Sequence, residues 1–281
     1  MNPSGEAANA TLVASQKYNK KIPLLRTEST ILARAFPGSS GHQDDYPFPF
    51  TRVEVFDGYR NYPYRAIGKL FFANSKPCSA SAVSSPNNNL IWTAGHCLTN
   101  NGEVASGVKF APAYKDGNAP YGRWEACQLY VQRDWFYNSD WRYDLGAIKA
   151  CPRSDGARLH DVVGSLPITF NAPRNHHWSA FGYPENSPFT GERLITAQSS
   201  HGHDDPKTDP VRPIGIGSDM TPGSSGGPWI LNLTRNIAGS SRNVVNGVVS
   251  YSWPETDNAQ YSPYHGDKAK TLRQRAIDDG A

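Results

Sequence analysis

Charged residues are scarce in this chain, at 19% of its 281 residues, and the formal net charge at pH 7 is only +3. No block of lysine and arginine occurs, and no basic stripe is interleaved with aromatic residues. Because nucleic-acid binding relies on such basic surfaces, we expect no nucleic-acid partner. Apolar runs of the ~18 residues that span a bilayer are also missing, so we expect no membrane partner.

Cysteine is rare as well, and its pattern excludes the common zinc motifs. The four cysteines contain no CxxC pair, and they are Cys78, Cys97, Cys127 and Cys151. Two disulfides in an oxidising compartment are therefore expected, and no metal or cofactor is predicted. The N-terminus lacks the basic and apolar regions of an export signal, so we expect that the signal has been removed from a secreted protein.

Turn-forming and aromatic residues are abundant by contrast, with 25 Gly, 22 Pro, 14 Tyr and 7 Trp. This mixture is typical of many short strands joined by turns. Strand patterns run through residues 66–151, and a second series runs through residues 177–253. The spacing predicts an all-β protein with antiparallel strands in two similar halves.

Both ends of the chain differ from the strand series. Residues 1–50 are polar, with an amphipathic helix predicted at 27–36, and we interpret them as an N-terminal extension or propeptide-like segment. The segment 266–280 predicts a terminal helix that is capped by Asp267 and ended by Gly280. We expect this helix to cover the end of the second half.

The stretch IWTAGHC ends in His96 and Cys97, after an apolar strand. Its small residues predict a turn that presents the imidazole, and a disulfide from Cys97 would hold that turn in place. Cys78 lies 19 positions earlier and is the natural partner. Closing a loop of this length contributes about 3 kcal/mol in the chain-entropy account. Cys127 then pairs with Cys151, which makes this the most local of the three connectivities.

The stretch WRYDLGAIKA places Asp144 at the start of an alternating strand, where a carboxylate can be buried and aimed by the backbone. Asp140, in the polar turn YNSDW, is the nearest competitor and is expected to stay solvated. His96, Asp144 and a serine would form a catalytic set. The imidazole takes the serine proton, and the carboxylate fixes the tautomer and stabilises the imidazolium.

The stretch DMTPGSSGGPWI offers two candidate serines, Ser224 and Ser225. In acyl transfer on such a turn, the oxyanion is held by the N–H of the nucleophile and the N–H two positions earlier. If Ser225 attacks, the donors are Ser225 and Gly223. If Ser224 attacked, the second donor would fall on Pro222, which has no N–H. The sequence therefore predicts Ser225 as the nucleophile, with Gly223 and Ser225 forming the oxyanion hole.

The segments TAGHC, DLGAI and GSSGGP together resemble the active-site segments of the chymotrypsin-fold serine peptidases, in that family's order. GSSGGPWI, NGVVSYSW and YSPYHGDKAKTL look more specifically like secreted bacterial trypsin-like peptidases related to the glutamyl endopeptidases. The resemblance covers residues 65–275 and implies two antiparallel six-stranded β-barrels with the active site between them. We place the first barrel at 51–155 and the second, with the terminal helix, at 156–281.

Two positions bear on activation and specificity within this family. Digestive-type members carry an aspartate before the nucleophile, which pairs with a newly cut N-terminal amine. Ser224 stands there in this chain, so that switch is expected to be absent. Asp219 lies six residues before Ser225, where trypsin-like members keep the aspartate that attracts Lys or Arg. Because a mispaired buried charge is costly, the resemblance implies a Lys/Arg preference.

The same resemblance implies that Ser250, Tyr251 and Ser252 form the other wall of the specificity pocket. The glutamyl branch has a histidine just before this serine, whereas this chain has Val249, which disfavours a strong preference for glutamate. Ser252 replaces the usual glycine and would narrow the pocket. The alternatives to a Lys/Arg preference are a preference for small residues, a preference for acidic residues and a broad specificity.

A cluster of potential metal ligands occurs in the stretch HGHDDPKTD, at residues 201–209. Its turn-forming residues favour an exposed loop, with calcium binding through the aspartates as the less favoured alternative.

We predict from these patterns a secreted, monomeric serine endopeptidase that acts on proteins or peptides. An esterase that uses the same three residues is one alternative, because acyl-enzyme chemistry does not itself require an amide. An inactive peptidase-like binding module is the other, and it would bind ligands without forming an acyl-enzyme.

Overall fold

The computed structural model describes residues 48–281, apart from 101, 255, 257 and 280–281. Every described residue belongs to one compact unit of the chain. The predicted helix at 27–36 and the predicted helix end at Gly280 lie outside the described residues.

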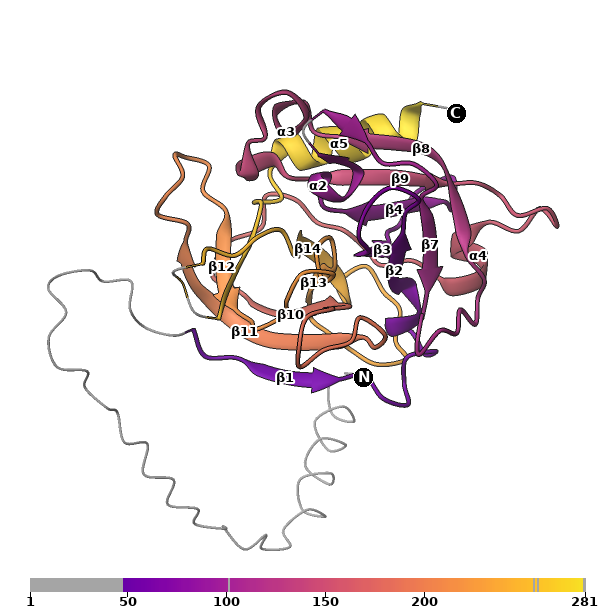
Figure 1. Ribbon diagram of the computed structural model, residues 1–281, viewed down its shortest axis with the longest axis horizontal. Coiled ribbons are helices and arrows are strands. Elements are labelled where there is room, and N and C mark those ends of the chain that lie inside the picture. The colour runs from indigo at the N-terminus through magenta and orange to yellow at the C-terminus, as the bar shows by residue number, and fades with distance from the viewer. Residues whose placement is uncertain (1–47, 101, 255, 257, 280–281) are drawn as a thin grey trace, which may run out of the picture. The chain divides into compact units, whose positions relative to one another are not determined.

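Six antiparallel strands close into a barrel in the first half of this unit (Figure 1). In order around the barrel they are β2 (Ile67–Phe71), β3 (Cys78–Ala82), β4 (Leu90–Thr93), β9 (Gly146–Ala150), β8 (Trp124–Val131) and β7 (Lys109–Pro112). β3, β4 and β9 are buried along their whole length, which explains why small and apolar residues dominate their sequences. The first predicted barrel is confirmed.

The second half forms a seven-stranded sheet that curls into a half-barrel. Its main path is β14 (Val244–Val248), β13 (Pro228–Leu231), β10 (His177–Gly182), β11 (Ile195–Asp204), β12 (Ile214–Gly217) and β15 (Ala259–Ser262). The two ends of this path share no strand ladder in the described chain. They are joined by an antiparallel bridge between Tyr251, just after β14, and Tyr261 of β15, and by a hydrogen bond from the Val248 N–H to Ser262 Oγ at 2.9 Å. The six strands of this path form the second predicted barrel, and the two-barrel fold is confirmed. This barrel is open on one side, because the chain leaves the β14 ladder just where residues 249–252 pass the nucleophile turn.

The first strand of the described chain, β1 (Thr51–Glu54), pairs with β11 of the second sheet. The sequence boundary at residue 51 assigned this segment to the first barrel, and the pairing places it in the other half. An edge position on β11 was available to it, whereas the first barrel is closed and offers no free edge.

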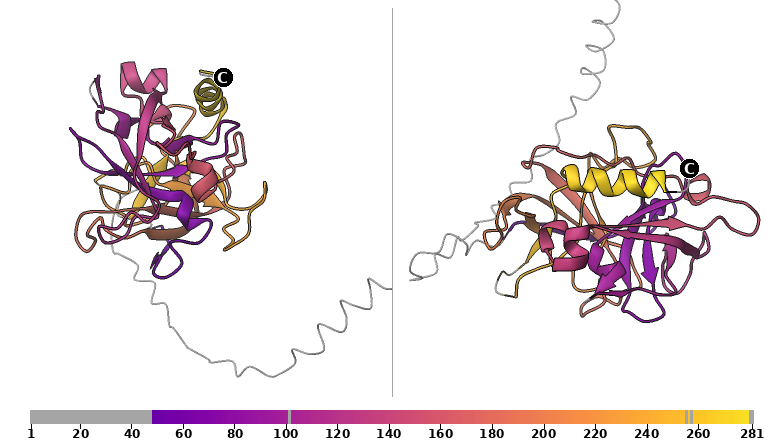
Figure 2. Two further views of the ribbon diagram at one scale, coloured as in Figure 1. Left: turned by 90° about the vertical axis from the view of Figure 1, so that its right-hand side faces the viewer. Right: turned by 90° about the horizontal axis from the view of Figure 1, so that it is seen from above.

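The terminal helix α5 (Asp267–Asp278) packs on the first barrel and does not cover the second sheet, as Figures 1 and 2 show. Its buried residues Ala269, Leu272 and Ala276 belong to the same apolar cluster as β4 and β9. The Gln132 side chain donates to the Lys268 carbonyl. The expected position of this helix was wrong, because the chain crosses back from β15 to the first barrel.

The start of α5 also differs from the expectation. Gly266 occupies the N-cap position, and no side chain caps the helix there. Asp267 is instead the first helical residue, and its carboxylate accepts a hydrogen bond from Asn171 at 2.7 Å. The carboxylate still lies at the helix N-terminus, where the helix dipole favours negative charge.

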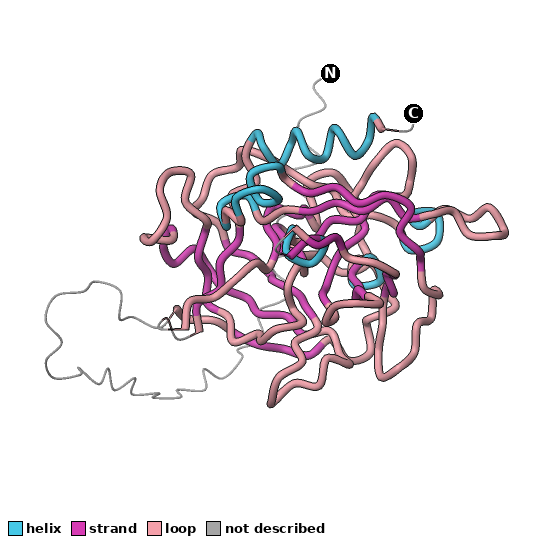
Figure 3. The backbone as a smooth tube through the Cα atoms, turned by 45° about the horizontal axis from the view of Figure 1, so that its top comes forward, coloured by secondary structure: helices cyan, strands magenta, loops and turns pink. Residues whose placement is uncertain are grey.

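The other helical segments are short turns between strands, and the longest helix, α5, lies outside the strands (Figure 3). They are α2 (Gly95–Leu98), α3 (Arg133–Asn138), α4 (Leu159–Val163), η1 (Tyr64–Ala66) and η2 (Trp141–Tyr143). A small hairpin is formed by β5 (Thr99–Asn100) and β6 (Glu103–Val104). Among the described helices, none has the length and apolar composition needed to cross a membrane.

Both predicted disulfides are present. Cys78 of β3 bonds to Cys97 of α2, and Cys127 of β8 bonds to Cys151 just after β9. The first ties the histidine turn to the barrel wall, and the second clips two neighbouring strands together.

Candidate active site

His96 and Asp144 meet because they lie at the ends of neighbouring strands. His96 is in α2, directly after β4, and Asp144 ends η2 just before β9, which pairs with β4. His96 Nδ1 lies 2.8 Å from Asp144 Oδ2, and the His96 backbone N–H donates to Asp144 Oδ1 at 2.6 Å. From the second sheet, Ser250 Oγ donates to Asp144 Oδ2 at 2.5 Å. Asp144 is fully buried, so these donors fix a carboxylate that in turn orients the imidazole.

The environment of His96 makes it a stronger base than an ordinary histidine. Burial lowers its pKa, but the charge of Asp144 and the hydrogen bond to it outweigh burial, so the pKa is raised above the usual value. The carboxylate also favours the tautomer with the proton on Nδ1, which leaves Nε2 free to accept a proton.

Aromatic rings enclose this pair. The ring centroids of Trp135 and Trp141 lie 6.2 and 6.0 Å from that of His96. Trp141 in turn packs on Tyr251, with a centroid distance of 4.9 Å. These rings restrict water around the imidazole and strengthen its contact with Asp144.

Asp140 does not compete with Asp144 for His96. Its carboxylate accepts hydrogen bonds from the guanidinium of Arg142, at 2.9 Å from Nε and 2.7 Å from Nη2. Asp140 stays partly exposed, and Arg142, two positions along the chain, folds back onto it.

The two adjacent serines differ in what their hydroxyls can do. Ser224 is 2% exposed, and its Oγ donates to the Thr221 carbonyl at 2.7 Å. Ser225 is partly exposed, and both serines line the same pocket. The Ser225 carbonyl oxygen lies 3.6 Å from the sulfur of Cys97, the residue after His96. The Ser224 hydroxyl therefore stabilises the turn, whereas Ser225 lies beside the turn that carries His96.

Backbone N–H groups at this turn are available to a ligand. Within the described residues, neither Gly223 N–H nor Ser225 N–H has a hydrogen-bond acceptor. Glycine is required at Gly223, whose φ is +96°, and at Gly226, whose φ is +80°. A Cβ on Gly226 would also collide with Thr93 of the first barrel. The turn thus leaves one N–H group on each side of Ser224 without an acceptor among the described residues.

A pocket of about 210 Å³ lies beside Ser225. One wall is formed by residues 249–252, which include the predicted Ser250, Tyr251 and Ser252, and the other by residues 220–222. Gln260 of β15 also lines the pocket. Sequence reasoning missed Gln260, because β15 carries no motif that relates it to the nucleophile turn.

Asp219 is not brought to this pocket. It lies outside the lining, and its Oδ2 accepts a hydrogen bond from the guanidinium of Arg52 on β1. No charged side chain lines the pocket among the described residues. Asp219 occupies the position predicted for a carboxylate that selects a cationic substrate side chain, but Arg52 of this chain's own β1 is the cation that pairs with it.

Residues 201–204 belong to β11 rather than to the expected loop, and Asp204 and Asp205 are both bound to other side chains. Asp205 is fully buried and accepts hydrogen bonds from Tyr251 Oη at 2.5 Å and Trp253 Nε1 at 3.2 Å. Asp204 pairs with Arg174 at 2.9 Å and with His201 at 3.1 Å. The expectation of an exposed loop does not hold for Asp205, which instead anchors the pocket wall through Tyr251.

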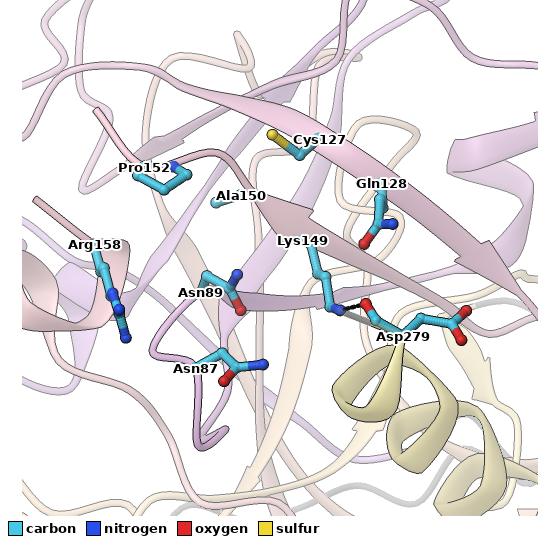
Figure 4. Close-up of a pocket in the computed structure, with 9 residues that line it drawn as sticks. All are labelled: Asn87, Asn89, Cys127, Gln128, Lys149, Ala150, Pro152, Arg158 and Asp279. Carbon is cyan, nitrogen blue, oxygen red and sulfur yellow. Dashed lines mark hydrogen bonds between the residues drawn. The ribbon is translucent and has the colours of Figure 1, made fainter. Parts of the chain in front are cut away.

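A second pocket, of about 300 Å³, lies on the outer side of the first barrel beside the end of α5 (Figure 4). The Lys149 side chain points into this region and donates to the Asp279 carbonyl. Asn87, Asn89 and Arg158 also line it. Its lining holds no serine or histidine that could act as nucleophile or base, so it is not a second hydrolytic centre.

No family profile and no curated protein matches the chain, but solved structures do. Protease Anisep from Arthrobacter nicotinovorans is 38% identical, over 76% of this chain and 95% of its own, with a TM-score of 0.68. The thermostable serine protease AL20 from an extremophilic microorganism is 34% identical, over 76% of this chain and 97% of its own, also at 0.68. A Glu endopeptidase shares the fold at 19% identity, over 80% of this chain and 96% of its own, with a TM-score of 0.63.

Proposed function

Because the chain belongs to the chymotrypsin-fold, trypsin-like serine peptidases, we propose that it is a secreted serine endopeptidase that works through an acyl-enzyme. The observation that carries this proposal is the pairing of His96 with buried Asp144 next to a turn that presents Ser225 and two unpaired N–H groups. These are the parts that acyl transfer by a serine requires.

The proposed reaction begins when His96 Nε2 takes the proton of Ser225 Oγ as that oxygen bonds to the scissile carbonyl carbon. The carbonyl oxygen becomes an oxyanion, which accepts hydrogen bonds from the N–H groups of Gly223 and Ser225. Asp144 stabilises the imidazolium. His96 then gives the proton to the leaving amine, the C–N bond breaks, and the acyl group remains on Ser225. Water repeats the sequence, releases the acid and returns the proton to Ser225.

We propose that the pocket selects uncharged side chains of broad type rather than Lys or Arg. The support is the neutral lining of the described pocket and the pairing of Asp219 with Arg52. A lysine or arginine side chain would have to leave water without a charged partner there, which is unfavourable.

We propose that the protein acts outside the cell, as a monomer, on protein or peptide substrates. Two disulfides are typical of proteins that fold in an oxidising compartment. One chain supplies the base, its carboxylate, the nucleophile and the pocket, so catalysis needs no second copy.

Labelling with a fluorophosphonate and peptide mapping test the proposal, with Ser225→Ala as the variant and Ser224→Ala as the matched control. We expect the label on Ser225, and loss of both label and peptide hydrolysis in Ser225→Ala by a factor on the order of 10⁴ or more. Ser224→Ala should keep its label, because the Ser224 hydroxyl faces the Thr221 carbonyl.

Other outcomes would replace the proposal. Hydrolysis of esters but not of peptides by the labelled protein would establish an esterase. An unlabelled protein that binds peptides without cleaving them would establish a binding module on a peptidase scaffold.

A further inference from the structure

One side chain of the first barrel reaches the nucleophile turn without belonging to the catalytic set. Ser79 of β3 is fully buried, and its hydroxyl donates to the Gly223 carbonyl at 2.9 Å. The same oxygen accepts the N–H of Tyr183 at 2.9 Å. The Ser79 N–H donates to the Ser225 carbonyl at 2.7 Å. A single residue thus holds two carbonyls of the turn from outside.

The remaining carbonyls of the turn are held as well. The Pro222 carbonyl accepts the N–H of Glu185 at 2.8 Å, and the Ser224 carbonyl accepts the N–H of Gly227 at 3.0 Å. A trans peptide is planar, so its C=O and N–H point in opposite directions. Fixing the Pro222 and Ser224 carbonyls therefore aims the N–H groups of Gly223 and Ser225 away from them, where no protein acceptor is found in the described chain.

The Gly223 carbonyl is the one in this series that depends on a side chain. Gly223 has a positive φ of +96°, and glycine rotates about its backbone more freely than any other residue. Without the Ser79 hydroxyl, this carbonyl would lose its donor in a buried setting. It would then turn toward another donor, and the Gly223–Ser224 peptide would turn with it. Because this peptide lies between the two peptides that carry the Gly223 and Ser225 N–H groups, the direction of one N–H group relative to the other would change.

Ser79 is itself held firmly. Thr93 Oγ1 donates to the Ser79 carbonyl at 2.9 Å. Lys69 is its direct partner across the β2–β3 ladder, and the buried Lys69 ammonium contacts Glu185 at 3.3 Å and Glu192 at 3.5 Å. The Lys69 contact steadies Glu185, whose N–H binds the Pro222 carbonyl. Through Lys69 and Ser79, β2 and β3 therefore support the peptide groups before and after Gly223.

We propose that Ser79 is a positioning residue for the oxyanion hole: its hydroxyl fixes the Gly223–Ser224 peptide, which lies between the two donor peptides, and thereby sets the direction of the Gly223 and Ser225 N–H groups relative to each other. This inference rests on the proposed peptidase function. It means that the first barrel, which supplies His96 and Asp144, also sets the geometry of the oxyanion donors in the second sheet.

Ser79→Ala tests the proposal, and Ser81→Ala is a matched control. Ser81 lies two positions along the same strand, is also fully buried, and its hydroxyl has no hydrogen-bond partner. We expect kcat of Ser79→Ala to fall about 10- to 100-fold with KM within about twofold. This is less than the 10²–10³ loss on deleting an oxyanion donor, since the N–H remains. Ser81→Ala should stay within about twofold of the parent in kcat, because it loses no contact to the turn.

Affinity for a transition-state analogue separates positioning from a general loss of stability. A peptidyl aldehyde forms a hemiacetal on the serine, and its oxygen occupies the oxyanion hole. Its inhibition constant should rise in Ser79→Ala by the same factor as kcat falls, whereas the constant for the corresponding product acid should not change. If Ser79→Ala does not fold, Ser79→Cys keeps the volume with a weaker donor and should show the same pattern.

The outcomes distinguish this inference from the function on which it rests. If kcat and aldehyde affinity of Ser79→Ala match those of Ser81→Ala while Ser225→Ala is inactive, the positioning role is wrong and the peptidase proposal stands. If Ser225→Ala retains peptide hydrolysis, the peptidase proposal itself is wrong.

Discussion

Arg52 and Asp219 show how one internal contact changes what a single residue means. Asp219 lies six residues before Ser225, where a carboxylate that selects a cationic side chain is expected, but its Oδ2 pairs with Arg52. The Arg52 guanidinium also lies over the Phe189 ring, 5.0 Å from its centroid. The other oxygen of Asp219, Oδ1, has no hydrogen-bond partner in the described chain, but it is buried and Asp219 does not line the pocket beside Ser225.

Asp219→Asn is therefore expected to leave substrate preference unchanged. The ratio of kcat/KM for peptides with lysine and with leucine before the cleaved bond should shift by less than about threefold, because neither side chain contacts Asp219. Paired fluorogenic peptides measure this ratio. A fall in the lysine-to-leucine ratio of about a hundredfold or more would mean that Asp219 does reach the substrate and that the uncharged-pocket proposal is wrong.

At the scale of elements, the two disulfides have different positions relative to the site. Cys78–Cys97 joins β3 to α2 and so links the strand of Ser79 to the turn of His96. Cys127–Cys151 joins β8 to the end of β9, on the side of the barrel where the second pocket lies. They close loops of similar length, 19 and 24 residues, so they should stabilise the fold to a similar extent but affect catalysis differently.

We expect the double variants Cys78→Ala/Cys97→Ala and Cys127→Ala/Cys151→Ala each to lose about 3 kcal/mol in the free energy of unfolding. Only Cys78→Ala/Cys97→Ala should also lose kcat/KM under conditions where the protein stays folded, because the disulfide that it lacks holds the His96 turn. Urea unfolding and peptide kinetics on the same samples measure both effects. Full activity in folded Cys78→Ala/Cys97→Ala would show that the turn keeps its geometry without the bond.

At the scale of the whole molecule, His265 lies where the two halves and the terminal helix meet. It follows β15 just before α5, accepts a hydrogen bond from Trp92 of the first barrel at 3.3 Å, and is fully buried. Its carbonyl accepts the N–H of Asn171 from the segment between the two halves. Burial lowers the pKa of His265 to about 3, so the folded protein keeps this imidazole neutral.

This burial predicts that the fold loses stability in mild acid. The unfolded chain binds a proton at His265 near the ordinary histidine pKa of about 6.5, whereas the folded state resists protonation down to the lowered pKa. Stability from this residue is therefore present above pH ~6.5 and is lost as the pH falls, by about 2 kcal/mol between pH 7 and pH 5.

Urea unfolding of the parent protein and of His265→Gln at pH 7 and pH 5 measures this effect. The variant should lose less stability over this interval, by about the amount that His265 contributes. His160, whose pKa is also lowered by burial, is present in both proteins and cancels in the comparison. Equal pH dependence in the two proteins would contradict the prediction.

Sequence alone was sufficient where the relevant residues are neighbours in the chain or follow a strand pattern. The strand series of the first barrel and the disulfide pairs follow from short-range signals, namely apolar runs, turn residues and cysteine spacing. The prediction of Ser225 rather than Ser224 rests likewise on local chemistry, since Pro222 has no N–H to offer, and the labelling experiment tests it.

Tertiary structure decided whatever depends on contacts between distant segments. The curl of the second sheet, the packing of α5 on the first barrel, the Arg52–Asp219 pair and the two carbonyls held by Ser79 join positions roughly 100 or more residues apart or depend on how strands close. Motifs record which groups a reaction needs, because those groups sit on single turns. They do not record which buried partner satisfies each carbonyl or carboxylate, because that is settled only when the whole chain packs and every polar group inside must find a partner.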